Sequence, residues 1–219
     1  MTPSMKSSLI LNAREPDMAD LALSKAAAII RDGGVVAFPT ESFYGLAADP
    51  ANERALGRLF EAKKRPANNP ILLLIDDKAR VFDYAAQVPK KSLVLMRKIW
   101  PGRLSLVFAA RPEVSSFITG GTGKIGLRVS SNLLACALAR LVGGAITGTS
   151  ANISQHRPCL TAEEVFKEIA ARVDAILDGG PCPGGQGTTV LDISQDPPRI
   201  LREGMVSKGE IERIIGEIT

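Results

Sequence analysis

The stretch ERALGRLFEAKKRPANNPILLLI, residues 53–75, joins a helical pattern to a continuous apolar run through a basic segment that contains two prolines. Apolar residues recur at helical spacing over 53–63, which predicts an amphipathic helix. The run ILLLI at 71–75 is apolar on both faces, which is typical of a strand buried on both sides. The segment KKRPANNP, residues 63–70, is therefore predicted to be the loop between a helix and a buried strand.

The same alternation of helices and strands extends along the chain. Residues 18–32 predict a helix that begins after a cap at Asp17 and ends at Gly33-Gly34. Capping boxes, in which a hydroxyl and a carboxylate each bind a free backbone amide, pair Thr161 with Glu164 and Ser207 with Glu210. Further apolar strands are predicted at 35–39, 104–109, 124–129, 144–148, 188–193 and 199–202. The pattern indicates an α/β fold with a mixed parallel and antiparallel sheet flanked by helices on both faces.

Composition places few limits on function. A chain of 219 residues with 45% hydrophobic content is predicted to form a single domain over 1–219. The net charge of +4, from 27 basic and 23 acidic residues, fits either an anionic metabolite or RNA. Three cysteines stand 23 residues apart in each interval, unlike the close pairs of zinc sites. Their odd number, and the lack of a long apolar run, predict a cytoplasmic protein with no membrane partner.

Three familiar motifs are present only in part. GGTGKIG at 120–126 has dinucleotide-loop spacing but precedes a predicted strand, and it has isoleucine where a Walker A loop needs Ser or Thr. GTSAN at 148–152 resembles a nucleophile elbow until Asn152 replaces the last glycine. The chain's one histidine, His156, is predicted to lie in a polar loop. Neither a dinucleotide site nor a serine triad is therefore expected.

Four polar stretches lie at or beside predicted strand ends: PTESFYG at 39–45, KKRPANNP at 63–70, TSANIS at 149–154 and GQGTTVLD at 185–192. Ligands of α/β sheets gather at such loops, so we expect these four to converge. Lys63 and Arg65 offer cationic donors for phosphate oxygens, and Ser150, Asn152 and Thr188 offer neutral hydrogen bonds. Together they predict a nucleoside triphosphate site without a Walker loop. Taken alone, a Lys-Lys-Arg run also fits a solvated helix end.

These stretches also carry a resemblance to a known family. Together with WPGRLSLVF at 100–108, GLRVSS at 126–131, ILDGG at 176–180 and ILREG at 200–204, they resemble the threonylcarbamoyl-AMP synthase family, also called YrdC-like. The similarity spans about residues 20–205. It implies a twisted mixed sheet with a basic concave face. It also implies a nucleotidyltransferase that converts L-threonine, bicarbonate and ATP to threonylcarbamoyl-AMP and pyrophosphate for tRNA modification.

The resemblance also implies roles for individual residues. Thr40 and Thr188 are expected to contact threonine, and Arg128 to join an anion site. The catalytic group is expected to be Lys63, Arg65, Ser150 and Asn152. The ATP contacts are expected to be these four residues together with Asn69 and Arg202. Mg²⁺ is expected through the ATP phosphates rather than through protein ligands. The expected partners are tRNA or structured RNA on the basic concave face, and proteins that transfer the threonylcarbamoyl group to tRNA.

The chain departs from the family pattern at several positions. Leu74 stands where many relatives carry a histidine that contacts threonine, Gly187 where glutamate is common, and Glu203 where proline is common. Lys124 occupies a position that is often threonine. The chain also resembles the short form of the family, without an additional C-terminal domain.

Two alternative functions remain open at this stage. One is a YrdC-like relative with a different carbamoyl acceptor, which Leu74 and Glu203 keep in view. The other is a double-stranded RNA-binding module without catalysis, whose affinity would fall steeply with salt. An aromatic content of 5% leaves little surface for stacking single-stranded RNA.

Overall fold

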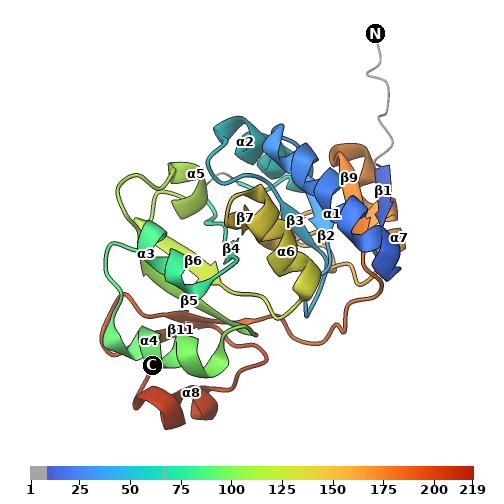
Figure 1. Cartoon of the computed structure of the whole chain (residues 1–219). Helices are drawn as coiled ribbons and strands as arrows, with labels where there is room; N and C mark the ends of the chain where they lie inside the picture. The colour runs from blue at the N-terminus through green and yellow to red at the C-terminus, as the bar shows by residue number, and fades with distance from the viewer. Residues whose placement is uncertain (1–8, 67) are drawn as a thin grey trace.

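The computed structural model describes residues 9–66 and 68–219, and within them eleven strands form two sheets (Figure 1). The five-stranded sheet has the order β1 (Leu9–Asn12), β9 (Ala175–Asp178), β2 (Val36–Phe38), β3 (Gly45–Ala47) and β8 (Thr149–Ser150). Its first three strands run parallel, and β3 and β8 are added in antiparallel pairs.

The six-stranded sheet is also mixed. Its order is β11 (Arg199–Arg202), β10 (Thr189–Asp192), β5 (Leu104–Ala109), β6 (Lys124–Arg128), β4 (Leu73–Ile75) and β7 (Ala145–Thr147). Strand β10 pairs in parallel with β5, and β4 with β6, whereas the other neighbours are antiparallel. The prediction of a mixed sheet is confirmed, with the strands divided between two sheets instead of one.

The chain passes from one sheet to the other at Gly148, between β7 and β8. Thr147 reinforces this junction from the last position of β7. Its hydroxyl donates to the carbonyl of Leu46 at 2.9 Å and accepts from the amide of Ala48, also at 2.9 Å. A single buried threonine therefore ties the six-stranded sheet to β3 of the other sheet, which holds the two sheets in fixed relation.

Helices cover the five-stranded sheet on both faces. Helices α1 (Pro16–Arg31) and α6 (Leu133–Val142) share one core cluster with alternate residues of β2 and β9. Helices α2 (Glu53–Lys63) and α7 (Ala162–Ile169) contribute to the cluster on the opposite face. The expectation of helices on both faces is thus met by this sheet.

The six-stranded sheet is covered unevenly: α6 packs against β4 and β7 at one end of the cleft face, through Leu74 and Ile146, and other helices cover the opposite face. Helices α4 (Lys90–Ile99) and α8 (Lys208–Ile215) contribute to its core cluster, and Figure 1 shows them together near the C-terminus. The short elements α3 (Val81–Tyr84), α5 (Ser116–Thr119), η1 (Lys78–Arg80) and η2 (Ala170–Arg172) complete the described helices. The face of this sheet away from α4 and α8 is the one that lines the cleft described below.

Several local predictions can be compared directly with the structure. The helix at 53–63 and the strand at 104–109 have the predicted bounds. The cap at Asp17 is wrong, because α1 begins at Pro16, two residues before the predicted start, and its N-cap residue is Glu15. The fixed φ and missing N–H of proline suit a first helical position. The short strands β1, β3, β8 and β9 were not predicted, since brief or glycine-containing runs carry a weak periodic signal.

Both predicted capping hydroxyls act as helix caps. Thr161 accepts from the amide of Glu164 at 3.1 Å, and Ser207 accepts from the amide of Glu210 at 3.2 Å. The Glu164 carboxylate accepts from the amide of Leu160 instead of that of Thr161.

Across residues 9–66 and 68–219, none of the helices combines the length and the apolar character needed to cross a membrane.

Candidate functional site

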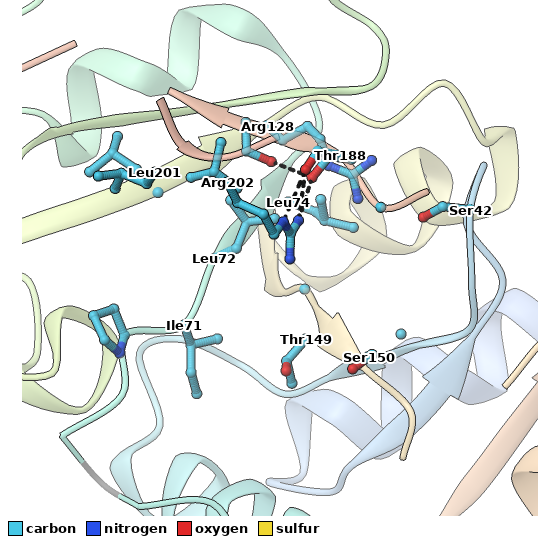
Figure 2. Close-up of a pocket in the computed structure, with 18 of the residues that line it drawn as sticks. Ser42, Ile71, Leu72, Leu74, Arg128, Thr149, Ser150, Thr188, Leu201 and Arg202 are labelled. Carbon is cyan, nitrogen blue, oxygen red and sulfur yellow. Dashed lines mark hydrogen bonds between the residues drawn. The ribbon is translucent and has the colours of Figure 1, made fainter. Parts of the chain in front are cut away.

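A cleft of about 820 Å³ lies on the face of the six-stranded sheet away from α4 and α8 (Figure 2). Side chains two residues apart on the same strand form its floor, because alternate residues of a strand point to the same face. The intervening residues, such as Leu104, Leu106 and Phe108 of β5, belong to the core on the other face. The floor consists of Ser105, Val107, Lys124, Gly126, Arg128, Leu72, Leu74, Thr188, Val190 and Asp192.

The four polar loops predicted to converge do meet at this cleft. Its lining includes Thr40 and Ser42 from the first loop, Arg65 and Pro70 from the second, Thr149 and Ser150 from the third, and Gln186 and Gly187 from the fourth. Each loop follows or precedes a strand of one of the two sheets, so the packing of the sheets fixes the loops relative to one another.

Lys63, the last residue of α2, does not line the cleft and is only 1% exposed. Its Nζ donates to the backbone carbonyl of Asn152 at 2.8 Å and to that of Ser150. Burial, with a smaller contribution from nearby Arg65, lowers the pKa of Lys63 to about 8. The lysine therefore acts as a clamp between the end of α2 and the 150–152 loop. The next residue, Lys64, is exposed with φ of 50°.

Arg65 faces the cleft, whereas Asn69 does not. The Arg65 Nη2 donates to the carbonyl of Pro70 at 2.8 Å, which holds the guanidinium against its own loop. Its Nε is buried without a hydrogen-bond partner among the described residues, and burial lowers the pKa of the group. The Asn69 side chain is exposed and lies outside the cleft lining. The structure thus brings Arg65 and Ser150 to the cleft but not Asn69.

Asn152 is buried beside the cleft and is held by its own loop. Its Nδ2 donates to the carbonyls of Ile153 at 2.8 Å and His156 at 2.7 Å. Its Oδ1 is buried and, within the part of the chain that the structure describes, has no hydrogen-bond partner. The His156 ring is exposed, with Nδ1 at 2.7 Å from Glu168 Oε1. The histidine therefore lies in a polar loop, as predicted.

Thr40 shapes the first loop through its hydroxyl. The Oγ1 donates to the carbonyl of Phe43 at 2.7 Å and accepts from the amide of Ser42 at 3.1 Å. Such hydroxyl–backbone bonds form compact turns. Thr40 lines the cleft, but its proton is committed to the turn and its oxygen also accepts from the amide of Phe43 at 3.3 Å, so the hydroxyl chiefly shapes the loop.

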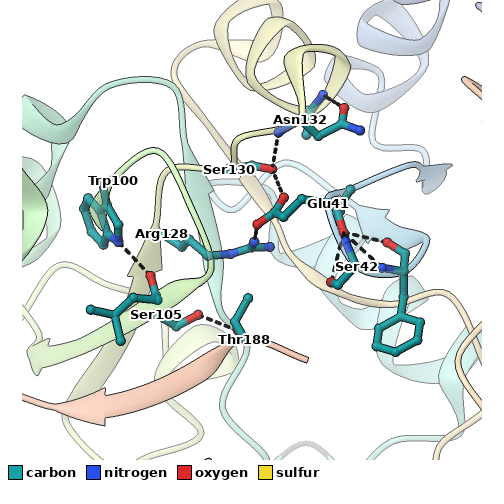
Figure 3. Close-up of polar contacts among 12 residues, drawn as sticks. Glu41, Ser42, Trp100, Ser105, Arg128, Ser130, Asn132 and Thr188 are labelled. Atoms are coloured by element: carbon teal, nitrogen blue, oxygen red, sulfur yellow. Dashed lines mark hydrogen bonds and ion pairs between the residues drawn. The ribbon is translucent and has the colours of Figure 1, made fainter. Parts of the chain in front are cut away.

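A buried ion pair lies at the edge of the cleft (Figure 3). Arg128 Nη1 pairs with Glu41 Oε1, with side chains 5% and 7% exposed, and the Ser130 hydroxyl donates to the other carboxylate oxygen of Glu41. Burial, followed by the repulsion of Arg202, lowers the pKa of Arg128 to about 10. Arg128 lines the cleft, and its role at an anion site stays a prediction. Glu41 was missed, because its partner is distant in sequence.

Arg202 and Thr188 are joined by three hydrogen bonds (Figure 2). Arg202 donates to the Thr188 carbonyl from Nε at 3.2 Å and from Nη2 at 2.8 Å, and Nη2 also lies 3.1 Å from Thr188 Oγ1. A dashed line in Figure 3 joins the same hydroxyl to Ser105. The Ser105 Oγ lies 3.0 Å from Thr188 Oγ1. Ser105 was not predicted as a site residue. The sequence did contain one indication of it: Ser105 is a polar residue between apolar residues in a predicted buried strand.

The cleft lining is basic overall. Its cations are Arg65, Lys124, Arg128 and Arg202, and its carboxylates are Asp192 and Glu203. Lys124 Nζ lies 2.6 Å from Asp192 Oδ2. Burial alone would raise the pKa of Asp192, but hydrogen bonds from Lys124 and Ser194 outweigh it and lower the pKa. The pair keeps Asp192 ionised on the floor.

Leu74 lies on the cleft floor and is 1% exposed. A Cβ on Gly148 would lie 2.8 Å from Leu74 Cγ, so the glycine allows this leucine to pack against the junction between the sheets. Within residues 9–66 and 68–219, no group of three or more His, Cys, Asp or Glu side chains is arranged to hold a metal ion.

Comparison with known proteins assigns this chain to a protein family. A model of the Sua5/YciO/YrdC family, described as "Telomere recombination", matches residues 28–204. The chain belongs to the Sua5/YciO/YrdC family. The match covers all four loops of the cleft.

Individual relatives agree with this assignment. The chain is 38% identical over 200 residues to a threonylcarbamoyl-AMP synthase of Bacillus subtilis (strain 168), covering 91% of this chain and 58% of the relative. Its structure resembles that of Pyrococcus abyssi Sua5 complexed with L-threonine, with a TM-score of 0.92 and 37% identity over 96% of this chain and 62% of that one. It also resembles Escherichia coli YciO, with a TM-score of 0.80 and 27% identity over 92% of this chain and 97% of that one. The chain thus spans about three fifths of the first two relatives.

Proposed function

We propose that this protein synthesises threonylcarbamoyl-AMP and pyrophosphate from L-threonine, bicarbonate and ATP. The observation that carries the proposal is one cleft in which Arg65, Ser150, Thr40 and Thr188 meet, although they come from four separate loops. Support comes from the relatives, since one is named threonylcarbamoyl-AMP synthase and another was crystallised with L-threonine.

The size and charge of the cleft suit these substrates. A volume of about 820 Å³ lies within the range of sites that hold a nucleotide-sized ligand. Arg65 at one wall supplies a guanidinium that matches phosphate oxygens, and Ser150 adds a hydroxyl beside it. Thr40 and Thr188 also line the cleft and are proposed to contact threonine. Lys63 serves the ATP site indirectly, by holding the backbone of the 150–152 loop.

The proposed reaction needs no protein nucleophile. The threonine amine attacks the carbon of CO2, or of bicarbonate with loss of water, and forms a carbamate. A carbamate oxygen then attacks the α-phosphorus of ATP, the bond to the β-phosphate oxygen breaks, and pyrophosphate leaves. The protein's part is to align the two reactants and to neutralise the charge on the phosphates. Mg²⁺ is proposed to enter this site bound to the ATP phosphates, the oxygen ligands that it commonly takes from a nucleotide substrate.

The partners follow from the product. Threonylcarbamoyl-AMP is an activated acyl donor, so we propose that other proteins transfer its threonylcarbamoyl group to tRNA. The basic cleft lining is the surface that would approach RNA.

An omission experiment tests the proposed function. Pyrophosphate release from ATP is measured with L-threonine and bicarbonate together and with each left out, and the product is identified by mass spectrometry. The proposal expects release that depends on both substrates. Release that ignores threonine would instead indicate a relative with another carbamoyl acceptor. No release, together with salt-sensitive binding of double-stranded RNA, would indicate a binding module.

A further inference from the structure

Ser105 is a fully buried hydroxyl with one hydrogen-bond partner in the described part of the chain. It lies on β5, is 0% exposed, and its Oγ is 3.0 Å from Thr188 Oγ1. A hydroxyl of Ser or Thr has one proton to donate and two positions at which to accept. If Thr188 donated to Ser105, the Ser105 proton would be buried without an acceptor, which is unfavourable. The arrangement that satisfies both groups has Ser105 donating to Thr188.

Arg202 occupies the second acceptor position of the same oxygen. Its Nη2 donates to Thr188 Oγ1 at 3.1 Å, and a guanidinium has donors only. With Ser105 and Arg202 both donating, Thr188 has no acceptor position left inside the protein, and its own proton is free to turn away from them. Thr188 lines the cleft, so that direction is the cleft.

We propose that Ser105 is a positioning residue that, together with Arg202, makes Thr188 a hydrogen-bond donor to the carboxylate of the amino-acid substrate. The inference rests on the proposed function and deepens it, because it gives threonine an orientation. A carboxylate only accepts hydrogen bonds and an ammonium only donates them, so this hydroxyl state favours the carboxylate and disfavours the amine. The Arg202 guanidinium, which is bonded to Thr188, favours a negative group beside it, whereas the nearby Arg128 charge is offset by Glu41. The threonine amine is left to face the rest of the cleft, where it must meet CO2 and ATP.

The test compares the KM values of three variants in the threonine-dependent pyrophosphate assay. Ser105→Ala removes the donor, Ser105→Thr keeps a hydroxyl on a strand that accommodates a β-branched side chain, and Ser92→Ala is the matched control. Ser92 is also 0% exposed and its hydroxyl makes one bond, to the carbonyl of Pro89 at 2.6 Å, on α4 away from the cleft lining. Each variant is also assayed with L-threoninamide in place of L-threonine, because its carboxamide is neutral.

Ser105→Ala is expected to raise the KM for L-threonine about five- to twentyfold, with kcat and the KM for ATP within about twofold of the wild type. The KM for L-threoninamide should rise less, so that the preference for the carboxylate shrinks. Ser105→Thr should restore the wild-type values, and Ser92→Ala should leave both KM values unchanged.

Three results would overturn the inference while leaving the proposed function intact. They are an unchanged threonine KM in Ser105→Ala, an equal rise for threonine and ATP, and an equal rise for threonine and its amide. Failure of the proposed function would look different. The wild-type protein itself would then release no pyrophosphate in response to threonine, and the inference would fall with the function.

Discussion

Replacement of Lys63 by methionine separates a structural contribution from a functional one. Methionine keeps the length and most of the volume of the lysine but removes the charge and both hydrogen bonds to the 150–152 loop. Two hydrogen bonds from a charged donor contribute about 1.5–3 kcal/mol each to the free energy of unfolding. Against this, the pKa of Lys63 falls from 10.5 to about 8, so burial of the ammonium opposes folding by about 3 kcal/mol. The net loss of stability is therefore expected to be about 0–3 kcal/mol.

The activity should fall much further than the stability. Without the clamp, the backbone of Ser150 and Asn152 is free to shift, and a displacement of about 1 Å in a positioning group can reduce a rate about 10²-fold. We expect kcat/KM for threonine-dependent pyrophosphate release to fall by about that factor in Lys63→Met. Urea unfolding, followed by circular dichroism, measures the stability of the same variant. The matched control is Lys64→Met, because the neighbouring lysine is exposed and makes no such contact.

Three outcomes would refute this reasoning. Wild-type kcat/KM in Lys63→Met would show that the clamp does not position the loop. An activity loss matched by unfolding of most of the protein under assay conditions would show that Lys63 is needed only for folding. Equal effects in Lys63→Met and Lys64→Met would point to the charge of the loop as a whole rather than to the buried contacts.

Three further predictions follow from the same contacts. Wild-type kcat/KM should decline as pH rises through about 8, because folded Lys63 loses its proton there. The free energy of unfolding should instead rise between about pH 8 and 10.5, because only the unfolded chain keeps that proton in this range. Thermal melts should show this rise for the wild type and not for Lys63→Met. Glu41→Gln should reduce the free energy of unfolding in urea by about 3–5 kcal/mol, since it leaves the buried Arg128 charge without its partner; wild-type stability would contradict a buried ion pair. Gly148→Ala should lower stability by about 1–3 kcal/mol in calorimetry, because its Cβ would lie 2.8 Å from Leu74 Cγ, and an unchanged melting temperature would show that the junction between the sheets can yield.

Sequence patterns predicted the elements with long, regular periodicity. The helix at 53–63 has apolar residues on one face over three turns, and the strand at 104–109 is apolar at nearly every position, so both were located correctly. Strand β8 has two residues and β3 has three, which is too short for any period to be detected. These strands exist because neighbouring strands offer their backbone groups as partners, and that information is not local.

The site was predicted in part for the same reason. Chemistry and loop position were sufficient to bring Arg65, Ser150 and Thr188 to one cleft. The same reasoning suggested that Lys63 would bind phosphate, and the family resemblance implied ATP contacts for Lys63 and Arg202. In this structure the hydrogen bonds of both side chains are made to protein groups. A cation in a polar loop has the same sequence signature whether it faces a phosphate or a carbonyl of its own chain.

By itself, the sequence determined the α/β class, the four polar loops at strand ends and the family resemblance, because these depend on residue type, spacing and order along the chain. Tertiary structure alone decided which groups meet. Lys63 reaches carbonyls 87 and 89 residues away, the Ser130 hydroxyl bonds to Glu41 across 89 residues, and the hydroxyls of Ser105 and Thr188 meet across 83. Hydrogen bonds act over about 3 Å, so such partners are set by how the two sheets pack and not by the residues beside them in the chain.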